Sequence, residues 1–250
     1  MKKGMILFMV SILVACTPNT KEETTMPKEE TTATMTTTIQ TTDETITTQE
    51  IIETTKAMKS EKDIDDYNSI YVIINKQRPL PENYEPSDLV IPNVSLMKEL
   101  YLRKEAAKAI EEMFEAALKD GIELKIGSGY RSYAYQSRLY SNYAKRDGEE
   151  AASRYSSKPG QSEHQTGLVV DLAASNEVCY LEQCFEDTKE AQWLFEHSYK
   201  YGFVLRYLKD KEDITGYMYE PWHYRYIGKE EAKKVYESGL TLEEYFGLLE

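Results

Sequence analysis

The sequence is poor in several residue types, and each shortage excludes a class of protein. Only three of its 250 residues are cysteine, so the chain is not a scaffold built on disulfides. Lysine and arginine number 30 against 43 aspartate and glutamate, which gives a formal net charge of −13. Binding of phosphate backbones needs clustered positive charge, so we expect no nucleic-acid partner. Phenylalanine is also scarce, with 6 residues against 20 tyrosines, which indicates amphipathic packing or a wet cleft lined with hydroxyl groups.

The longest uncharged apolar run lies at the N-terminus. Two lysines precede residues 4–15, a stretch that is too short to span a bilayer comfortably but is typical of a secretory signal. It ends in Leu13-Val14-Ala15-Cys16, which resembles the lipobox of bacterial lipoprotein precursors. That resemblance implies removal of residues 1–15 and lipidation of Cys16, which would anchor the protein to the extracytoplasmic face of a membrane. The alternative is an ordinary secretory signal that contains a cysteine by chance.

The next segment is polar and rich in threonine. Blocks of threonine alternate with glutamate, lysine and glutamine, and aromatic residues are absent between residues 17 and 58. Such a segment cannot bury enough apolar surface to offset its chain entropy, so we predict a disordered stalk. The sequence therefore divides into a signal peptide at 1–15, a lipidated cysteine with a stalk at 16–63, and one folded domain at 64–250.

The folded part mixes helices and strands. We predict a helix from Ser95 to Ala117 that is closed by Gly121, a second helix capped by Ser132, and a third that opens with a capping box of Asp187 and Glu190. Short helices are expected at 230–238 and 242–246. Strands are expected at 70–75, 122–127, 166–172, 203–207 and 222–226. This order favours an α+β domain with a small, mainly antiparallel sheet.

Two of the three histidines lie in segments with the residues of a metal site. A catalytic zinc site takes three protein ligands and leaves one position open, and His164, Asp171 and His223 would supply two imidazoles and one carboxylate. His164 lies on the loop that enters the strand ending at Asp171, so both side chains can turn toward one point. The alternative is that both histidines pack in the core.

Glu220 has the position of a general base. It lies three residues before His223, and the proline that follows it favours extended backbone, so its carboxylate can lie beside a metal ion without binding it. The helical H-E-x-x-H motif is absent, so this would be a different kind of zinc site.

The remaining histidine and two of the cysteines are predicted to have structural roles. His197 shares a helix face with Trp193 and Leu194, which predicts a packed core histidine. Cys179 and Cys184 form a local disulfide or remain free thiols, and the sequence leaves both open.

Three motifs in order carry a family resemblance. They are S-G-Y-R-S at 128–132, S-x-H-x-x-G-x-x-x-D at 162–171 and E-x-W-H-x-R at 220–225. Together they resemble the D-alanyl-D-alanine carboxypeptidases of the VanY type, which are zinc peptidases of family M15. Relatives in that family include L,D-carboxypeptidases that trim peptidoglycan tetrapeptides. The similarity runs from about Tyr71 to the C-terminus and implies the M15 fold.

The resemblance also implies roles for individual residues. Zn²⁺ would be held by His164, Asp171 and His223, with Glu220 as the general base. Arg131 would bind the substrate and stabilise its carbonyl oxygen as negative charge develops, unless it serves only in an ion pair. Further cleft positions are implied for Gln136, Ser162 and Tyr207. Gln136 could instead be a solvated helix residue, and Ser162 could simply cap a turn.

The leading hypothesis is a surface-anchored zinc carboxypeptidase that removes the C-terminal D-alanine from peptidoglycan stem peptides. The sequence leaves open whether the substrate is the pentapeptide (D,D) or the tetrapeptide (L,D). Alternatives are an endopeptidase of the same fold and a non-catalytic lipoprotein that binds wall peptides, although a mere binder has no need of Glu220. A monomer is the default expectation.

Overall fold

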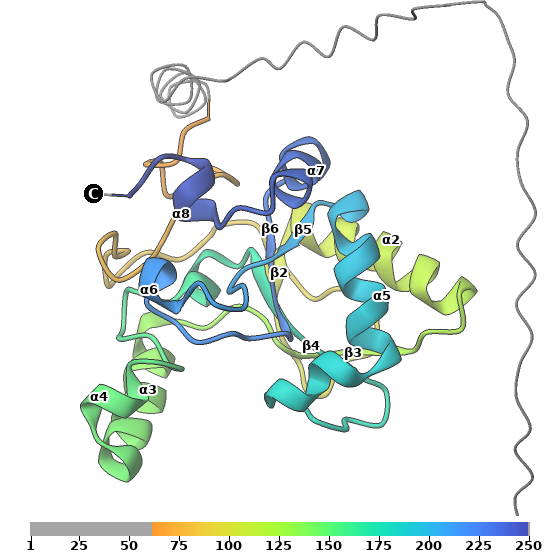
Figure 1. Cartoon of the computed structure of the whole chain (residues 1–250). Coiled ribbons are helices and arrows are strands. Elements are labelled where there is room, and N and C mark those ends of the chain that lie inside the picture. The colour runs from red at the N-terminus through yellow and green to blue at the C-terminus, as the bar shows by residue number, and fades with distance from the viewer. Residues whose placement is uncertain (1–61, 250) are drawn as a thin grey trace, which may run out of the picture. The chain divides into compact units, whose positions relative to one another are not determined.

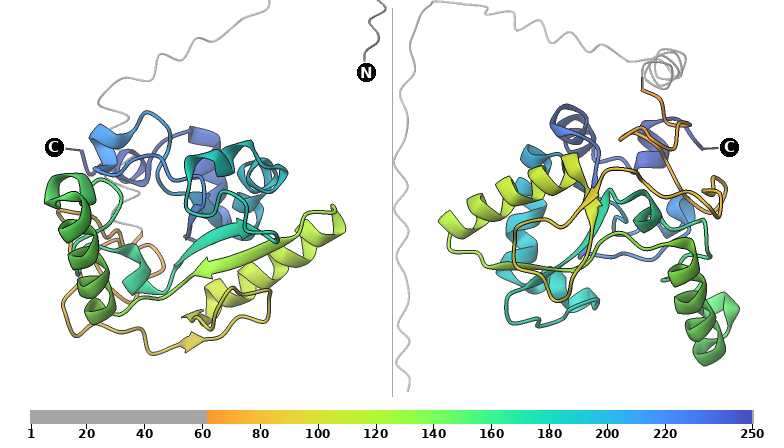
Figure 2. Two further views of the ribbon diagram at one scale, coloured as in Figure 1. Left: turned by 90° about the horizontal axis from the view of Figure 1, so that it is seen from below. Right: turned by 180° about the vertical axis from the view of Figure 1, so that it is seen from behind.

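The computed structural model describes residues 62–249, whose elements are shown in Figures 1 and 2. The predicted signal peptide, Cys16 and all but the last residues of the 16–63 segment lie outside the described residues. Ile64, the expected first residue of the folded domain, is buried. Within residues 62–249 no helix combines the length and the apolar character needed to cross a membrane.

A four-stranded antiparallel sheet forms the centre of the domain. Its order is β3 (Leu124–Ser128), β4 (Val169–Ala174), β6 (His223–Tyr226) and β5 (Phe203–Leu205). Every residue of β4 is buried, as expected for an interior strand rich in valine, leucine and alanine. A separate two-stranded sheet pairs β1 (Leu89–Val90) with β2 (Leu102–Arg103). The predicted α+β class with a small antiparallel sheet is confirmed.

Helices lie around this sheet. In Figures 1 and 2, α3 (Tyr133–Asp147) and α4 (Glu149–Ala152) lie at the opposite end of the domain from α2 (Lys104–Lys119) and α5 (Lys189–His197). The remaining α-helices of residues 62–249 are α6 (Glu212–Thr215), α7 (Lys229–Ser238) and α8 (Leu242–Tyr245). Single 3₁₀ turns complete the domain: η1 (Glu163–Thr166), η2 (Gln183–Asp187) and η3 (Ser198–Tyr201).

The strand predicted at 70–75 is wrong, although the segment is buried. Its apolar residues pack in the core, but its carbonyl groups do not bond to a neighbouring strand. They accept instead from guanidinium groups: Arg225 donates to the carbonyls of Ile70 and Val72, and Arg78 donates to that of Ile73. A β-branched run thus signals burial here, while long side chains from elsewhere satisfy its backbone.

The long helix begins later than predicted. It starts at Lys104 and not at Ser95, because residues 95–97 run beside β3, where the N–H of Ile126 donates to the Ser95 carbonyl. The end is as expected: the helix stops at Lys119, and Gly121 adopts a φ of +75°, which glycine tolerates best.

Two predicted helix caps had different outcomes. Ser132 caps α3 and accepts a hydrogen bond from the Tyr135 N–H, as expected. The predicted box of Asp187 and Glu190 is wrong, because Thr188 caps α5 and accepts from the Ala191 N–H. Thr188 presents a hydroxyl at the position where the backbone turns into the helix.

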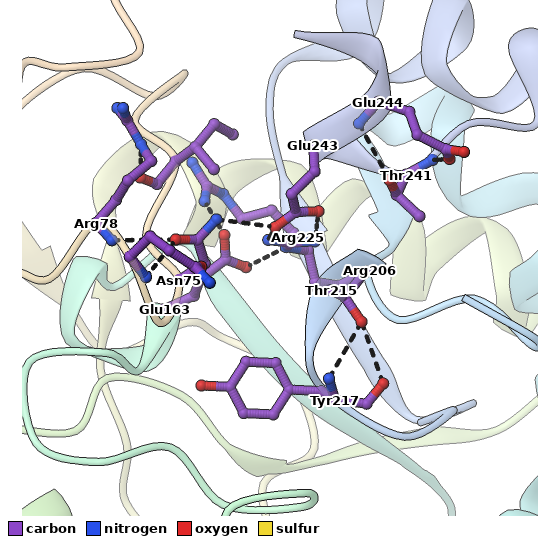
Figure 3. A network of polar contacts seen from close by, with 12 residues as sticks. Asn75, Arg78, Glu163, Arg206, Thr215, Tyr217, Arg225, Thr241, Glu243 and Glu244 are labelled. Carbon is purple, nitrogen blue, oxygen red and sulfur yellow. Dashed lines mark hydrogen bonds and ion pairs between the residues drawn. The ribbon is translucent and has the colours of Figure 1, made fainter. Parts of the chain in front are cut away.

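A buried ion network connects the C-terminal helix to the sheet (Figure 3). Arg206 contacts Glu163 through Nε at 3.0 Å and Glu243 through Nη2 at 2.6 Å. Arg225 contacts Glu163 at 2.9 Å, and the Asn75 amide donates to Glu243 at 3.2 Å. The ionic side chains are at most 4% exposed, and two positive charges balance two negative ones. The network joins η1, β6 and α8. It thereby links two hydrophobic clusters, one that contains the tyrosines of β6 and one that contains Leu242 and Tyr245 of α8.

We predict that Arg206→Met lowers the free energy of unfolding by about 3 kcal/mol, because it leaves Glu243 buried without its cationic partner. The measurement is urea unfolding followed by circular dichroism. Lys119→Met is the matched control, since Lys119 and Glu115 form an exposed pair, and its effect should stay below about 0.5 kcal/mol. Equal effects of the two substitutions would contradict this account of the network.

Candidate active site

Strand pairing brings the three predicted metal ligands together. Asp171 in β4 lies opposite His223 in β6, and His164 in η1 precedes β4 by one tight turn. That turn passes through Gly167 at a φ of +68°, a conformation that favours glycine. Asp171 lies 3.3 Å from His164 Nε2 through Oδ2 and 3.3 Å from His223 Nδ1 through Oδ1. One ligand atom of each residue lies within 4.8 Å of the others, so the three can hold a metal ion.

His164 turns the lone pair of Nε2 toward this point, where it accepts a hydrogen bond from Arg131 Nη2 at 2.9 Å. Its Nδ1 lies 2.7 Å from the carbonyl oxygen of Gly129, which can only accept, so Nδ1 carries the hydrogen and Nε2 faces Asp171. Burial, reinforced by the positive charge of Arg131, lowers the pKa of His164 to about 4. The imidazole is therefore neutral near pH 7, which is the form that binds metals.

Asp171 and His223, the other two candidate ligands, stabilise opposite charges on each other. Burial acts to raise the pKa of Asp171, but His164, His223 and Arg131 outweigh it and hold that pKa well below its usual value. Burial likewise acts to lower the pKa of His223, but Asp171 and Glu220 outweigh it and raise that pKa to about 9. Asp171 Oδ1 is buried and makes no hydrogen bond to the described part of the chain. This oxygen faces only His223 Nδ1 at 3.3 Å, so a metal ion that replaces the imidazole proton would satisfy it.

Glu220 lies directly beside the trio. Its Oε2 is 3.3 Å from His223 Nδ1, and its side chain is buried in the wall of the cleft. Burial raises the pKa of Glu220 above its ordinary value. A carboxyl group that exchanges a proton more easily near neutral pH is what general acid–base chemistry requires.

Arg131 contacts both Asp171 and His164. Its Nη2 lies 2.6 Å from Asp171 Oδ2 and 2.9 Å from His164 Nε2, while its Nε donates to Ser128 Oγ at 2.9 Å. The ion pair that the sequence left open as an alternative is therefore present. The guanidinium also faces the cleft, so the same contacts hold a positive charge at the reaction centre.

Gln136 lies behind Arg131 and does not line the cleft. Its side chain is 1% exposed, so the alternative of a solvated helix residue is wrong. Its amide oxygen accepts from Arg131 Nη1 at 3.3 Å, and its nitrogen donates to the Ser157 carbonyl at 2.8 Å. The geometry gives Gln136 a role in orienting the guanidinium.

Ser162 and Tyr207 both line the cleft, as expected. Ser162 stands at the start of η1, but its side chain makes no capping hydrogen bond, so a capping role does not account for it. The Tyr207 ring centre lies 4.8 Å from that of His223, and its side chain is buried. Tyr207 therefore packs against one of the candidate metal ligands.

The cleft itself has a volume of about 900 Å³ and contains the trio, Glu220 and Arg131. Sequence reasoning did not single out five of its tyrosines: Tyr135, Tyr143, Tyr155, Tyr180 and Tyr217. The excess of tyrosine over phenylalanine indicates a cleft lined with hydroxyl groups, but it does not identify which tyrosines line it.

The remaining predicted residues lie outside the trio. His197 is only half-buried and stacks on Trp193, with ring centres 4.7 Å apart, so it is packed but not a core residue. Cys179 and Cys184 form a disulfide, which decides between the two alternatives and occupies both sulfur atoms.

Comparison with known proteins places the chain in a family. The model of the D-alanyl-D-alanine carboxypeptidase family VanY matches residues 99–229. The putative carboxypeptidase YodJ of Bacillus subtilis (strain 168) is 49% identical over 183 residues, which cover 71% of this chain and 67% of that protein.

Solved structures share the fold. The LdcB LD-carboxypeptidase superposes with a TM-score of 0.69 and 48% identity over 74% of this chain and 88% of that one. A mutant of the vancomycin-resistance D,D-pentapeptidase VanY in complex with Zn(II) gives a TM-score of 0.61 and 33% identity over 72% of this chain and 99% of that one. The α+β fold expected from the M15 resemblance is thus confirmed, and the chain belongs to the VanY family of D-alanyl-D-alanine carboxypeptidases.

Proposed function

We propose that this protein is a zinc-dependent L,D-carboxypeptidase that removes the terminal D-alanine from peptidoglycan tetrapeptides. The observation that carries the proposal is the arrangement of Asp171 between two histidines, with the buried carboxyl group of Glu220 beside them. A wall-peptide binder without activity would have no use for that fourth group.

The three ligand residues suit zinc. Two imidazoles and one carboxylate are a donor set of catalytic zinc sites, and the buried Asp171 Oδ1 lacks a donor within the described chain. The VanY relative solved with Zn(II) supports the choice of metal. A bound zinc ion would supply a Lewis acid and lower the pKa of a coordinated water toward neutrality.

The residues around the trio would handle protons and charge. Glu220 takes a proton from the attacking water and delivers it to the amine of the departing D-alanine, for which its raised pKa is suited. Arg131 faces the same point and stabilises the negative charge that develops on the carbonyl oxygen. Ser128 and Gln136 hold its guanidinium in position.

Similarity favours the tetrapeptide over the pentapeptide. Identity is 48% to the LD-carboxypeptidase LdcB and 33% to the D,D-pentapeptidase VanY, over nearly equal shares of this chain. In a tetrapeptide the residue before the terminal D-alanine has the L-centre of a diamino acid. The shape of the cleft beside the metal site must distinguish that residue from D-alanine.

We also propose that the enzyme acts at the outer surface of a membrane. The support is the sequence Leu13-Val14-Ala15-Cys16 after a short apolar stretch. A lipid on Cys16 would anchor the chain, and residues 17–63 would separate the catalytic domain from the membrane.

Glu220→Gln should retain one zinc ion per chain and lower kcat by about 10³-fold, because it removes the proton acceptor and leaves the ligands intact. His164→Ala should lose the zinc ion itself. Metal content is measured by mass spectrometry and turnover by released D-alanine. Glu115→Gln, an exposed change of the same kind, is the control. Unchanged turnover of Glu220→Gln would remove it from the mechanism.

The zinc-loaded protein should release D-alanine from a synthetic tetrapeptide at least 10-fold faster than from the pentapeptide, and a chelator should abolish release. Amino-acid analysis of the products measures both rates. The opposite preference would assign D,D specificity. No release by the zinc-loaded protein would favour an endopeptidase or a binding role.

Cys16→Ser should abolish incorporation of radiolabelled palmitate in bacterial cells and release the protein from the membrane fraction. Membrane fractionation and autoradiography of the full chain measure both. If the unaltered protein takes up no label, the alternative of an ordinary secretory signal replaces the lipid anchor.

A further inference from the structure

A short loop closed by the disulfide forms part of the cleft wall. The disulfide joins Cys179 to Cys184, whose Cα atoms are 5.5 Å apart, in the connection between β4 and α5. We call residues 179–184 the disulfide loop. All four residues between the cysteines line the cleft: Tyr180, Leu181, Glu182 and Gln183. The loop therefore forms a continuous stretch of the cleft surface.

The backbone of this region is strained. Glu177, Cys179 and Leu181 have φ values of +61°, +55° and +58°, and they are three of the four non-glycine residues with positive φ in residues 62–249. Side chains rarely adopt this conformation, and it persists where the surrounding structure enforces it. Two of these residues, Cys179 and Leu181, lie within the ring that the disulfide closes.

The Tyr180 side chain packs closely against Gly127 of the central sheet. A Cβ atom at Gly127 in β3 would overlap the hydroxyl and ring of Tyr180, so only glycine at this position leaves room for the tyrosine. Burial, together with the negative charge of Asp171, raises the pKa of Tyr180, and Arg131 acts in the opposite direction. The Tyr180 hydroxyl thus stays protonated near neutral pH. It also interacts electrostatically with Asp171 and Arg131.

The loop also touches the segment that carries Glu220. The Gln183 side-chain amide donates to the carbonyl of Tyr219 at 3.3 Å. Outside the loop, Glu177 forms an ion pair with Lys125 of β3 at 2.9 Å. The Gln183 contact connects the loop to the residue that precedes Glu220.

The chemistry of the loop matches one kind of substrate side chain. Tyr180 and Leu181 offer apolar surface, and Leu181 is 42% exposed. Glu182 is exposed, and no ion pair links it to a lysine or arginine of the described chain. An aliphatic stem that ends in an ammonium group would satisfy both features, and the side chain of a diamino acid has this form.

We propose that the disulfide loop recognises the diamino acid that precedes the terminal D-alanine. Tyr180 and Leu181 pack on its methylene groups, and the Glu182 carboxylate pairs with its ammonium group. The disulfide holds these side chains in the cleft wall. The inference rests on the proposed carboxypeptidase function and names the substrate residue that gives the enzyme its specificity.

Two tetrapeptides that differ only in that residue test the pairing, one with lysine and one with 2-aminoheptanoic acid, whose side chain has a methyl group in place of the ammonium group. With the full-length, zinc-loaded protein, kcat/KM should be about fivefold higher for the lysine peptide, the size of effect expected for a partly exposed ion pair. Glu182→Gln should abolish this preference through KM while zinc content stays unchanged. Glu115→Gln removes the same charge on the exposed face of α2 and should keep the preference. Equal rates for the two peptides, or a preference that survives Glu182→Gln, would overturn the proposal.

The seating of Tyr180 is tested by a double-substitution cycle. Tyr180→Ala should raise KM for both peptides about 10-fold, and Gly127→Ala should do the same by displacing the ring. The double variant should be no worse than Tyr180→Ala alone, because the added methyl group then meets no tyrosine. Fully additive effects would mean that Gly127 acts independently of the loop and would contradict the proposed arrangement.

A binding measurement separates failure of the proposed carboxypeptidase function from failure of the role proposed for the disulfide loop. If the wild-type protein releases no D-alanine, calorimetry on Glu220→Gln measures the dissociation constants of the same two peptides. A fivefold tighter complex with the lysine peptide that depends on Glu182 would support the loop's role without catalysis. Equal dissociation constants would overturn it.

Discussion

The pairing of β4 with β6 is the constraint on which the site depends. It sets Asp171 opposite His223 on the two central strands of the sheet, where both side chains are largely buried in the wall of the cleft. Burial alone would neutralise both groups, yet their mutual attraction keeps the carboxylate charged and favours positive charge at the imidazole. The strand register therefore sets a buried carboxylate beside an imidazole whose proton a metal ion would replace.

A second charged cluster supports this register from the same side of β6. His223 and Arg225 alternate with tyrosines along the strand, so both project to one face. Arg225 pairs with Glu163, and the next residue is His164, the ligand that approaches from η1. The buried ion network of Figure 3 thus fixes the loop that carries one ligand to the strand that carries another. Because Glu243 joins the same network, α8 also contributes to the position of the site although it contacts no ligand.

The sequence allowed the grouping of the three candidate ligands to be predicted more reliably than several elements around them. His164, Asp171 and His223 were identifiable because few residue types bind metals and their motif order is specific. The segment 70–75 was misassigned because its apolar pattern records burial, whereas its hydrogen-bond partners are the distant Arg225 and Arg78. The place of Gln136 behind Arg131 likewise depends on a contact with Ser157 that no local pattern encodes.

Rigidity is distributed differently between the reaction centre and the cleft wall. The candidate ligands on β4 and β6, Asp171 and His223, are held by regular hydrogen bonding and close packing, which fix the spacing of their side chains without local strain. The disulfide loop has little regular structure and adopts left-handed backbone at two residues, Cys179 and Leu181. A covalent cross-link supplies there the order that the sheet supplies elsewhere. The candidate catalytic residues thus lie on or next to the sheet. Substitutions in the loop between β4 and α5 can alter which substrate side chain is recognised and still leave the candidate ligands in place.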